Sequence, residues 1–139
     1  MVTLLRPHRR LRASGGFTLI ELLVVITLIM ILAAISIAMY QNSIKRGEEA
    51  VLKMNLTQVR EAIDQYYADK GKYPASLDTL VSERYLREVP WDPMARARDK
   101  WIIEMAEPDP ANPSGAPGIY NVRSGAEGIA LDGSRYSSW

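Results

Sequence analysis

The feature that most constrains this chain is a long apolar run near its N-terminus, residues 17–40, from Phe17 to Tyr40. As an α-helix the run would be about 36 Å long, because each residue adds about 1.5 Å. The hydrocarbon core of a bilayer is about 30 Å thick. The run is therefore long enough to span a membrane, and it is longer than the apolar region of a typical signal peptide.

The residues before this run are basic. Residues 1–16 contain no Asp or Glu, and they carry four arginines: Arg6, Arg9, Arg10 and Arg12. Under the positive-inside rule, arginines before a span place the N-terminus in the cytoplasm. Everything after Tyr40 is then expected outside the inner membrane, with the Tyr40 ring at the membrane interface.

One charged residue, Glu21, lies inside the apolar run, and no Lys, Arg or His accompanies it there. A charge inside a membrane costs several kcal/mol, although less near the edge of a leaflet. Cleavage before Phe17 would create a positive α-amino group about one helical turn away, on the same chain or on a staggered neighbour. Such a pair inside an apolar bundle is far more favourable than either charge alone. The competing interpretation is a plain signal anchor with a stray Glu near its end.

The segment Gly16-Phe17-Thr18-Leu19-Ile20-Glu21-Leu22-Leu23-Val24-Val25 resembles the prepilin peptidase signature of the type IV pilin and pseudopilin superfamily. The resemblance implies cleavage between Gly16 and Phe17, N-methylation of Phe17, and a role in assembly for Glu21 paired with the Phe17 amine. It divides the chain into a basic leader that is removed (1–16), a transmembrane and polymerisation helix (17–40), and a periplasmic pilin-like head (41–139).

Composition argues against conventional enzyme chemistry. The chain has no Cys, and its single histidine, His8, lies in the leader. The folded part therefore lacks a histidine base, a thiol nucleophile and the usual zinc ligands. Removal of the leader takes away four of the 17 basic side chains and none of the 16 acids, which leaves a side-chain charge of −3. A slightly acidic product argues against general nucleic-acid binding.

Beyond the span the helical pattern continues with a second, amphipathic half. One apolar stripe recurs at alternating steps of four and three, at Leu52, Leu56, Val59, Ile63 and Tyr66. This spacing predicts a helix face packed on a core. Gly after Lys70, followed three residues later by Pro, predicts that the helix ends there.

The remaining residues predict a small α+β head. Ser76 is positioned to cap a short helix that carries Leu77, Leu80 and Val81. Strands are expected at 101–105 and 118–122, with a third near 128–131, and the proline-rich stretch between the first two is a loop. The expected fold is a long N-terminal helix, with a membrane-spanning first half, packed on a small antiparallel sheet.

The resemblance extends into the head. Three parts of the head are most similar to the major pseudopilin (G-type) of type II secretion systems. They are the segment 71–74, the segment 86–93 with its Pro-x-Asp-Pro element Pro90-Trp91-Asp92-Pro93, and the glycine-containing tail. Such pseudopilins commonly bind calcium in a C-terminal loop, and Asp132 would be the side-chain ligand. The tail after Arg123 offers only Glu127 and Asp132 as acids, so a glycine turn stabilised by Asp132 is the favoured alternative.

Two groups of charged residues outside the span are interpreted as surface. The acids Glu48, Glu49, Glu61 and Asp64 are expected to be solvated or to face other subunits. The basic cluster Arg96, Arg98 and Lys100 is expected in a solvated loop, with contact to a neighbouring subunit or to DNA as alternatives.

The expected function is that of a structural subunit, not an enzyme. It would polymerise, with other pseudopilins, into a type II secretion pseudopilus that helps move folded proteins across the outer membrane. The expected partners are copies of itself, minor subunits, the prepilin peptidase, an inner-membrane assembly platform and the membrane. The alternative is a pilus pilin for adhesion, motility or DNA uptake. A membrane-anchored enzyme and a binding module that does not polymerise are weaker alternatives.

Overall fold

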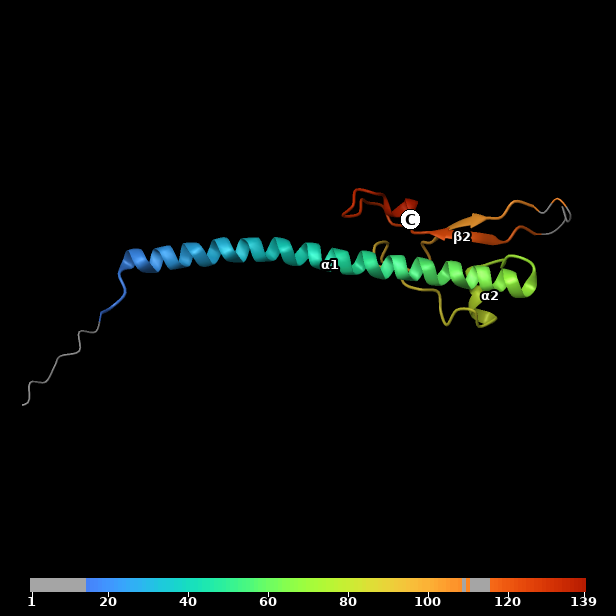
Figure 1. The fold of residues 1–139 in the computed structure, drawn as a ribbon, viewed down its shortest axis with the longest axis horizontal. Coiled ribbons are helices and arrows are strands. Elements are labelled where there is room, and N and C mark those ends of the chain that lie inside the picture. The colour runs from blue at the N-terminus through green and yellow to red at the C-terminus, as the bar shows by residue number, and fades with distance from the viewer. Residues whose placement is uncertain (1–14, 109, 111–115) are drawn as a thin grey trace, which may run out of the picture. The chain divides into compact units, whose positions relative to one another are not determined.

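The computed structural model describes residues 15–108, 110 and 116–139 (Figure 1). The elements are the helix α1 (Leu19–Lys70), the short helix α2 (Leu77–Ser82), the strands β1 (Ile102–Met105) and β2 (Ile119–Arg123), and a 3-10 turn (Tyr136–Ser138). The chain forms two compact units, Met1–Met39 and Tyr40–Trp139. The predicted α+β class with a small antiparallel sheet is confirmed.

Both ends of α1 are set by local chemistry. At the start, Thr18 lies outside the helix and its hydroxyl accepts a hydrogen bond from the Glu21 N–H at 3.2 Å. A Thr in this position satisfies a helix N–H that would otherwise have no partner. At the other end the chain turns at Gly71, whose φ of +67° suits glycine because it has no Cβ. The predicted end of the helix at Lys70 is confirmed.

The first part of α1 presents apolar side chains all round, and none of them is buried in the part of the chain that the structure describes. The exposed fraction of Leu19 is 85% and that of Met39 is 67%. Two of its hydroxyl groups bond within the helix: Thr27 donates to the Leu23 carbonyl and Ser36 to the Leu32 carbonyl, each at 2.8 Å. This pattern is typical of a helix surrounded by lipid or by other apolar helices.

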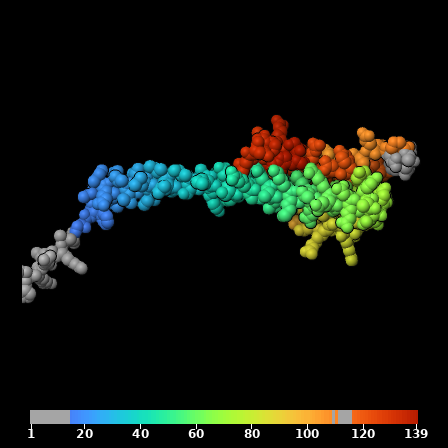
Figure 2. All heavy atoms as spheres, in the orientation of Figure 1, coloured from blue at the N-terminus to red at the C-terminus, as the bar shows by residue number. Residues whose placement is uncertain are grey.

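The second part of α1 supplies one side of the core of the Tyr40–Trp139 unit. The predicted stripe is confirmed, because Leu52, Leu56, Val59, Ile63 and Tyr66 are all buried, and Ala62 joins them. They pack on residues from the rest of the unit: Leu80, Leu86, Trp101, Ile119, Val122, Ala126, Ala130 and Tyr136. In Figure 2 the atoms of these later segments lie directly against this part of the helix.

The helix α2 begins where its sequence predicts. The Ser76 hydroxyl accepts a hydrogen bond from the Thr79 N–H at 3.2 Å, and Leu80 is buried against the core. The segment that follows α2 returns to α1 through aromatic contact, because the rings of Tyr66 and Tyr85 meet edge to face at 5.2 Å. In Figure 1, α2 and the two strands lie on different sides of α1.

The sheet has two antiparallel strands, with Ile103 opposite Val122 and an irregularity between Glu104 and Met105. A polar chain ties it to α1. The Arg60 guanidinium donates to the Asn121 side chain at 2.9 Å and to the Val122 carbonyl at 3.0 Å. Asn121 in turn donates to Glu104 at 2.6 Å. A two-stranded sheet is marginal alone in water, so its attachment to α1 is what makes it stable.

The predicted third strand near 128–131 is wrong. Within the described residues that region forms only an isolated bridge between Ile129 and Arg135. Two glycines with positive φ, Gly128 at +136° and Gly133 at +86°, turn the chain twice within six residues. The segment therefore bends back on itself before the final turn instead of extending the sheet.

A buried carboxylate organises the loop between α2 and β1. Asp92 is fully buried, and one of its oxygens accepts hydrogen bonds from the N–H groups of Met94 and Ala95 at 2.8 and 2.9 Å. Its other oxygen accepts from the Ser124 hydroxyl, which comes from the segment after β2. Asp92 therefore joins two distant loops inside the core.

A close backbone approach lies next to this carboxylate. A Cβ added at Gly125 would lie 1.7 Å from the Lys100 carbonyl oxygen. Only glycine fits at that contact, which brings the start of β1 beside the end of β2.

We predict that Asp92→Ala destabilises the head by about 2–4 kcal/mol, because three donors lose their buried acceptor. Asp99→Ala removes an exposed carboxylate from the same loop and is expected to change stability by less than about 0.5 kcal/mol. Chemical denaturation of the full chain in detergent, followed by Trp fluorescence, measures both. Equal stability of the two variants would contradict the role given to Asp92.

Candidate assembly and C-terminal sites

The residues assigned to processing lie just before α1. Gly16 and Phe17 are exposed and non-helical, and α1 begins two residues after Phe17. A peptide bond in an exposed non-helical segment is accessible to a peptidase, whereas one inside a helix is not. The geometry is thus compatible with a cut between Gly16 and Phe17, which stays a prediction.

Glu21 occupies the first turn of α1, three residues after its cap. Thr18 accepts from the Glu21 N–H through its hydroxyl, and from the Leu22 N–H at 3.1 Å through its carbonyl. The positive end of the helix dipole lies in this turn and favours a carboxylate there. Thr18 and Glu21 have the spacing of a capping box, and this cap fixes the position of Glu21 relative to the start of the helix.

Among the described residues, α1 is the one helix that is long and apolar enough to cross a membrane. Its most apolar stretch lies near the N-terminus, and no part of that stretch is buried by the protein. This finding rests on length and composition, and the span of residues 17–40 stays a prediction.

Asp132 lies in the turn predicted from the sequence. Its Oδ1 accepts hydrogen bonds from the Ser134 N–H at 2.9 Å and from the Ser134 hydroxyl at 2.6 Å. The hydrogen bonds from Ser134 lower the pKa of the Asp132 carboxyl. Gly133, between these two residues, has a positive φ. Asp132 therefore stabilises a glycine turn.

A buried carboxylate, Glu49, fastens the C-terminal segment (residues 128–139) to α1. Its Oε1 accepts hydrogen bonds from the Tyr136 hydroxyl at 2.8 Å and from the Leu131 N–H at 2.9 Å. The expectation that Glu49 is solvated is wrong, since only 9% of the residue is exposed. Of the other acids of that group, Glu61 and Asp64 are exposed as expected, and Glu48 is partly buried.

Two lysines on the same face of α1 complete this contact. The Lys45 ammonium donates to the Ile129 carbonyl at 2.9 Å and lies 6.0 Å from the centre of the Tyr136 ring. The Lys53 ammonium lies 4.2 Å from the centre of the Trp139 ring, within the range of a cation–π interaction. In Figure 1 the C-terminal segment, drawn in red, runs beside α1.

The donor set of the C-terminal segment does not match a calcium site. Calcium takes six to eight oxygen ligands, with several carboxylates to offset its charge. No group of three His, Cys, Asp or Glu residues able to hold a metal exists in the part of the chain that the structure describes. Asp132 and Glu49 each direct one carboxylate oxygen at protein N–H and O–H donors.

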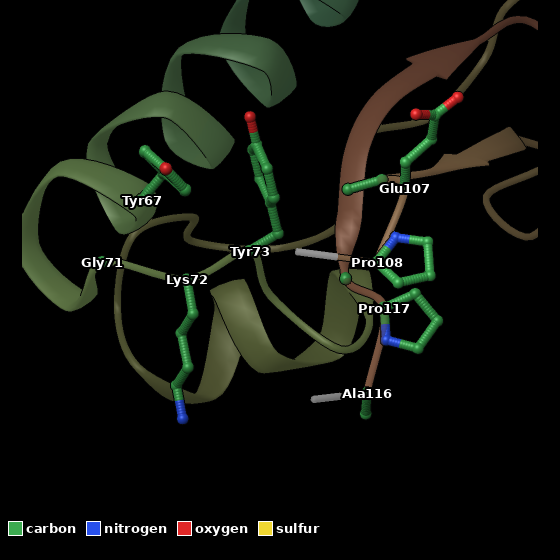
Figure 3. A pocket seen from close by; sticks show the side chains of 10 residues that line it. Tyr67, Gly71, Lys72, Tyr73, Glu107, Pro108, Ala116 and Pro117 are labelled. Carbon is green, nitrogen blue, oxygen red and sulfur yellow. The ribbon is translucent and has the colours of Figure 1, made fainter. Parts of the chain in front are cut away.

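A cavity of about 300 Å³ lies between the end of α1 and the start of β2, and Figure 3 shows its lining. The stacked rings of Tyr67 and Tyr73, with centres 4.4 Å apart, form one side. In the view of Figure 3 the Lys72 side chain points away from these rings. Glu107 is the one carboxylate among the described residues of the lining, so they offer no pair of acids for catalysis.

The basic cluster Arg96, Arg98 and Lys100 is exposed, as expected. Arg98 bonds to Glu88 at 2.6 Å and to the Val89 carbonyl at 3.1 Å, so it fastens the loop onto the preceding segment. Exposed ion pairs of this kind contribute little to stability, typically about 0–1 kcal/mol.

Comparisons with known proteins agree with this geometry. Residues 11–37 match the prokaryotic N-terminal methylation motif. The type II secretion system core protein G of Pseudomonas aeruginosa is 30% identical over 98 residues, which cover 59% of this chain and 69% of that protein. This chain belongs to the type IV pilin and pseudopilin superfamily.

Members of this superfamily from both kinds of system are similar to the chain. The fimbrial protein EcpC of Eikenella corrodens is 43% identical over 83 residues, 56% of this chain and 54% of that protein. A type IV major pilin protein PilE1 of Neisseria gonorrhoeae is 33% identical over 82 residues, 53% of this chain and 50% of that protein. The chain thus spans about half the length of these fimbrial and pilin relatives. No solved structure matches it.

Sequence reasoning missed three interactions: the cap that Thr18 makes at the start of α1, the burial of Asp92, and the hydrogen bond from Tyr136 to Glu49. The Thr-x-x-Glu spacing of Thr18 and Glu21 is a local signal that predicts the cap. Asp92 before Pro93 is a recognisable turn signal, but its burial depends on Ser124, which is 32 residues away. The bond from Tyr136 to Glu49 spans 87 residues and leaves no signal in a single sequence.

The hydrogen bond from Tyr136 to Glu49 predicts a loss of stability at high pH. Burial, together with the bond to Glu49 and its charge, raises the pKa of Tyr136 to about 12. An unfolded tyrosine ionises near pH 10. The stabilisation is therefore complete below about pH 10, and it is lost as the pH rises through about 12.

Tyr136→Phe is expected to remove this part of the pH dependence, whereas Tyr120→Phe, at an exposed ring, is expected to keep it. The measurement is the urea midpoint of the full chain in detergent at pH 9 and pH 11.5. If Tyr136→Phe lost as much stability as the unmodified protein over this range, the assignment would be wrong.

Proposed function

We propose that this chain is a subunit of a type II secretion pseudopilus, a filament built through α1 that helps move folded proteins across the outer membrane. The observation that carries the proposal is the extent of similarity to core protein G. That match covers 69% of the Pseudomonas aeruginosa protein and 68% of the one from Aeromonas hydrophila. The fimbrial and pilin matches cover about half of those proteins or less.

Processing is proposed to convert α1 from a membrane anchor into a polymerisation element. A prepilin peptidase would cut the exposed bond between Gly16 and Phe17, and the new amine of Phe17 would be N-methylated. Methylation keeps the amine positively charged. The product would be a single-pass inner-membrane protein with a cytoplasmic N-terminus and a periplasmic head.

Assembly is proposed to pair the Phe17 amine of an incoming subunit with Glu21 of its neighbour. Glu21 is the one acid of the apolar part of α1, and its cap by Thr18 places it at a fixed position in the first turn. An amine that neutralises this carboxylate inside an apolar bundle sets the register of one helix against the next. The remaining partners would be minor subunits and an inner-membrane assembly platform.

The second candidate is a pilin of a surface pilus, for adhesion, motility or DNA uptake. The observation that favours it is sequence identity, since the fimbrial protein EcpC is 43% identical against 30% for core protein G. Both candidates would polymerise through α1 in the same way. They differ in whether the filament serves a secretion system or a surface pilus.

Deletion of the gene separates the two candidates. We predict that the deletion strain retains its exoproteins in the periplasm while twitching motility and DNA uptake are unchanged, because the filament acts in secretion. Complementation with the unmodified gene is the control. Normal secretion together with lost twitching would overturn the first candidate in favour of the second.

A further inference from the structure

The C-terminal segment is attached to α1 partly through a backbone carbonyl that accepts a hydrogen bond from a lysine. Residues 128–139 bend back through two positive-φ glycines and must be held on α1. The Ile129 carbonyl faces α1 and accepts a hydrogen bond from a cationic group, the Lys45 ammonium, at 2.9 Å. Backbone carbonyls in such a loop are also the kind of oxygen that calcium takes as a ligand.

The acidic partner of this contact lies one turn further along the helix. Lys45 and Glu49 are four residues apart on α1, so they share a face, and Lys53 continues the same row. Glu49 accepts from the Leu131 N–H and the Tyr136 hydroxyl. A carboxylate that accepts from two protein donors has those lone pairs already used, so they are not free to bind a metal ion.

We propose that Lys45, with Glu49, holds the C-terminal segment on α1 in the role that the resemblance to major pseudopilins gives to calcium. The lysine ammonium supplies the positive charge and binds a loop carbonyl. Glu49 supplies the acceptor for the loop N–H and for the Tyr136 hydroxyl. Asp132 only closes the glycine turn through Ser134. This inference concerns the head alone and stands for either candidate filament.

Docking of the segment is therefore independent of divalent cations. A chelator leaves the fold of the head unchanged, and the subunit reaches its assembled form in a compartment depleted of calcium. Loss of the Lys45 charge, in contrast, releases the loop while the buried stripe of α1 stays packed.

Hydrogen exchange followed by mass spectrometry of the full chain in detergent tests this directly. The reporter is the Leu131 amide and its neighbours in the C-terminal segment, measured in EDTA and in millimolar CaCl2. Exchange is expected to be equal in the two conditions. Lys45→Met and Glu49→Leu, which each remove the bonding group, are expected to speed it roughly tenfold, the size of one lost hydrogen bond to a charged group.

Two controls make the result specific. Lys70→Met removes a helix lysine whose ion pair is with Glu83, at 2.8 Å, and should leave exchange of the C-terminal segment unchanged. Lys45→Arg keeps the charge and donors and should retain most of the protection. Amides of residues 52–66 report whether each variant is folded. If Lys45→Met unfolds this core, hydrogen exchange of the C-terminal segment is compared between Lys45→Arg and Lys45→Gln at a lower temperature.

The proposal is overturned if calcium slows exchange of the segment tenfold or more in the unmodified protein. It is also overturned if calcium raises the melting temperature by about 10 °C, the shift expected at a concentration one hundred times the Kd of a real site. Protection in Lys45→Met equal to that of the unmodified protein would likewise remove Lys45 from the role.

Discussion

The structure depends on one constraint: the first part of α1 exposes apolar side chains in every direction. Burial of a Leu or Ile side chain contributes about 1.5–3 kcal/mol. The run up to Tyr40 contains many such residues, and within the described part of the chain all of them are exposed. A charge near the edge of a bilayer costs only a few kcal/mol. The free energy gained when these apolar side chains leave water therefore outweighs the free-energy cost of placing the Glu21 charge near the bilayer. The first part of α1 is thus suited to an environment of lipid or of other apolar helices.

The same helix changes its role beyond Tyr40. From Leu52 onward one face is buried, and the other faces carry exposed polar residues such as Glu61 and Asp64. The two-stranded sheet, α2 and the C-terminal segment all add buried side chains to the one core that this part of α1 helps to form. A head built in this way is stable because α1 runs through it, so the element that polymerises and the element that organises the head are one helix.

Elements that depend on local chemistry or simple periodicity could be predicted from the sequence. The stripe from Leu52 to Tyr66, the cap at Ser76 and the helix end at Lys70 all follow from spacing within a few residues. The third strand was predicted from a short apolar run near Ile129, but the glycines on either side of the run bend the chain, and that effect overrode the pattern. Short apolar runs are the least reliable of such signals.

The residues of the candidate sites also differ in whether the sequence alone identifies their role. Glu21 could be singled out because a lone acid in an apolar run is visible without a structure. Glu49 could not, because an acid in a charged stretch of α1 is expected to be solvated until Tyr136 is placed beside it. The sequence identifies Asp92 only as part of the Pro-x-Asp-Pro element. Its role as a buried hydrogen-bond acceptor depends on Ser124, which only the fold brings beside it. Contacts between residues far apart in sequence are the part that one sequence does not specify.

The most direct test of the account is the filament yield of a Glu21→Ala variant expressed with an active prepilin peptidase, measured by shearing and electron microscopy. We expect the variant to insert in the membrane and to carry an N-methylated Phe17 by intact-mass measurement, yet to assemble few or no filaments. A Glu61→Ala variant, which changes an exposed acid of the same helix, is expected to assemble normally. Normal filaments from Glu21→Ala, or an intact Gly16–Phe17 bond in the unmodified protein, would contradict the account.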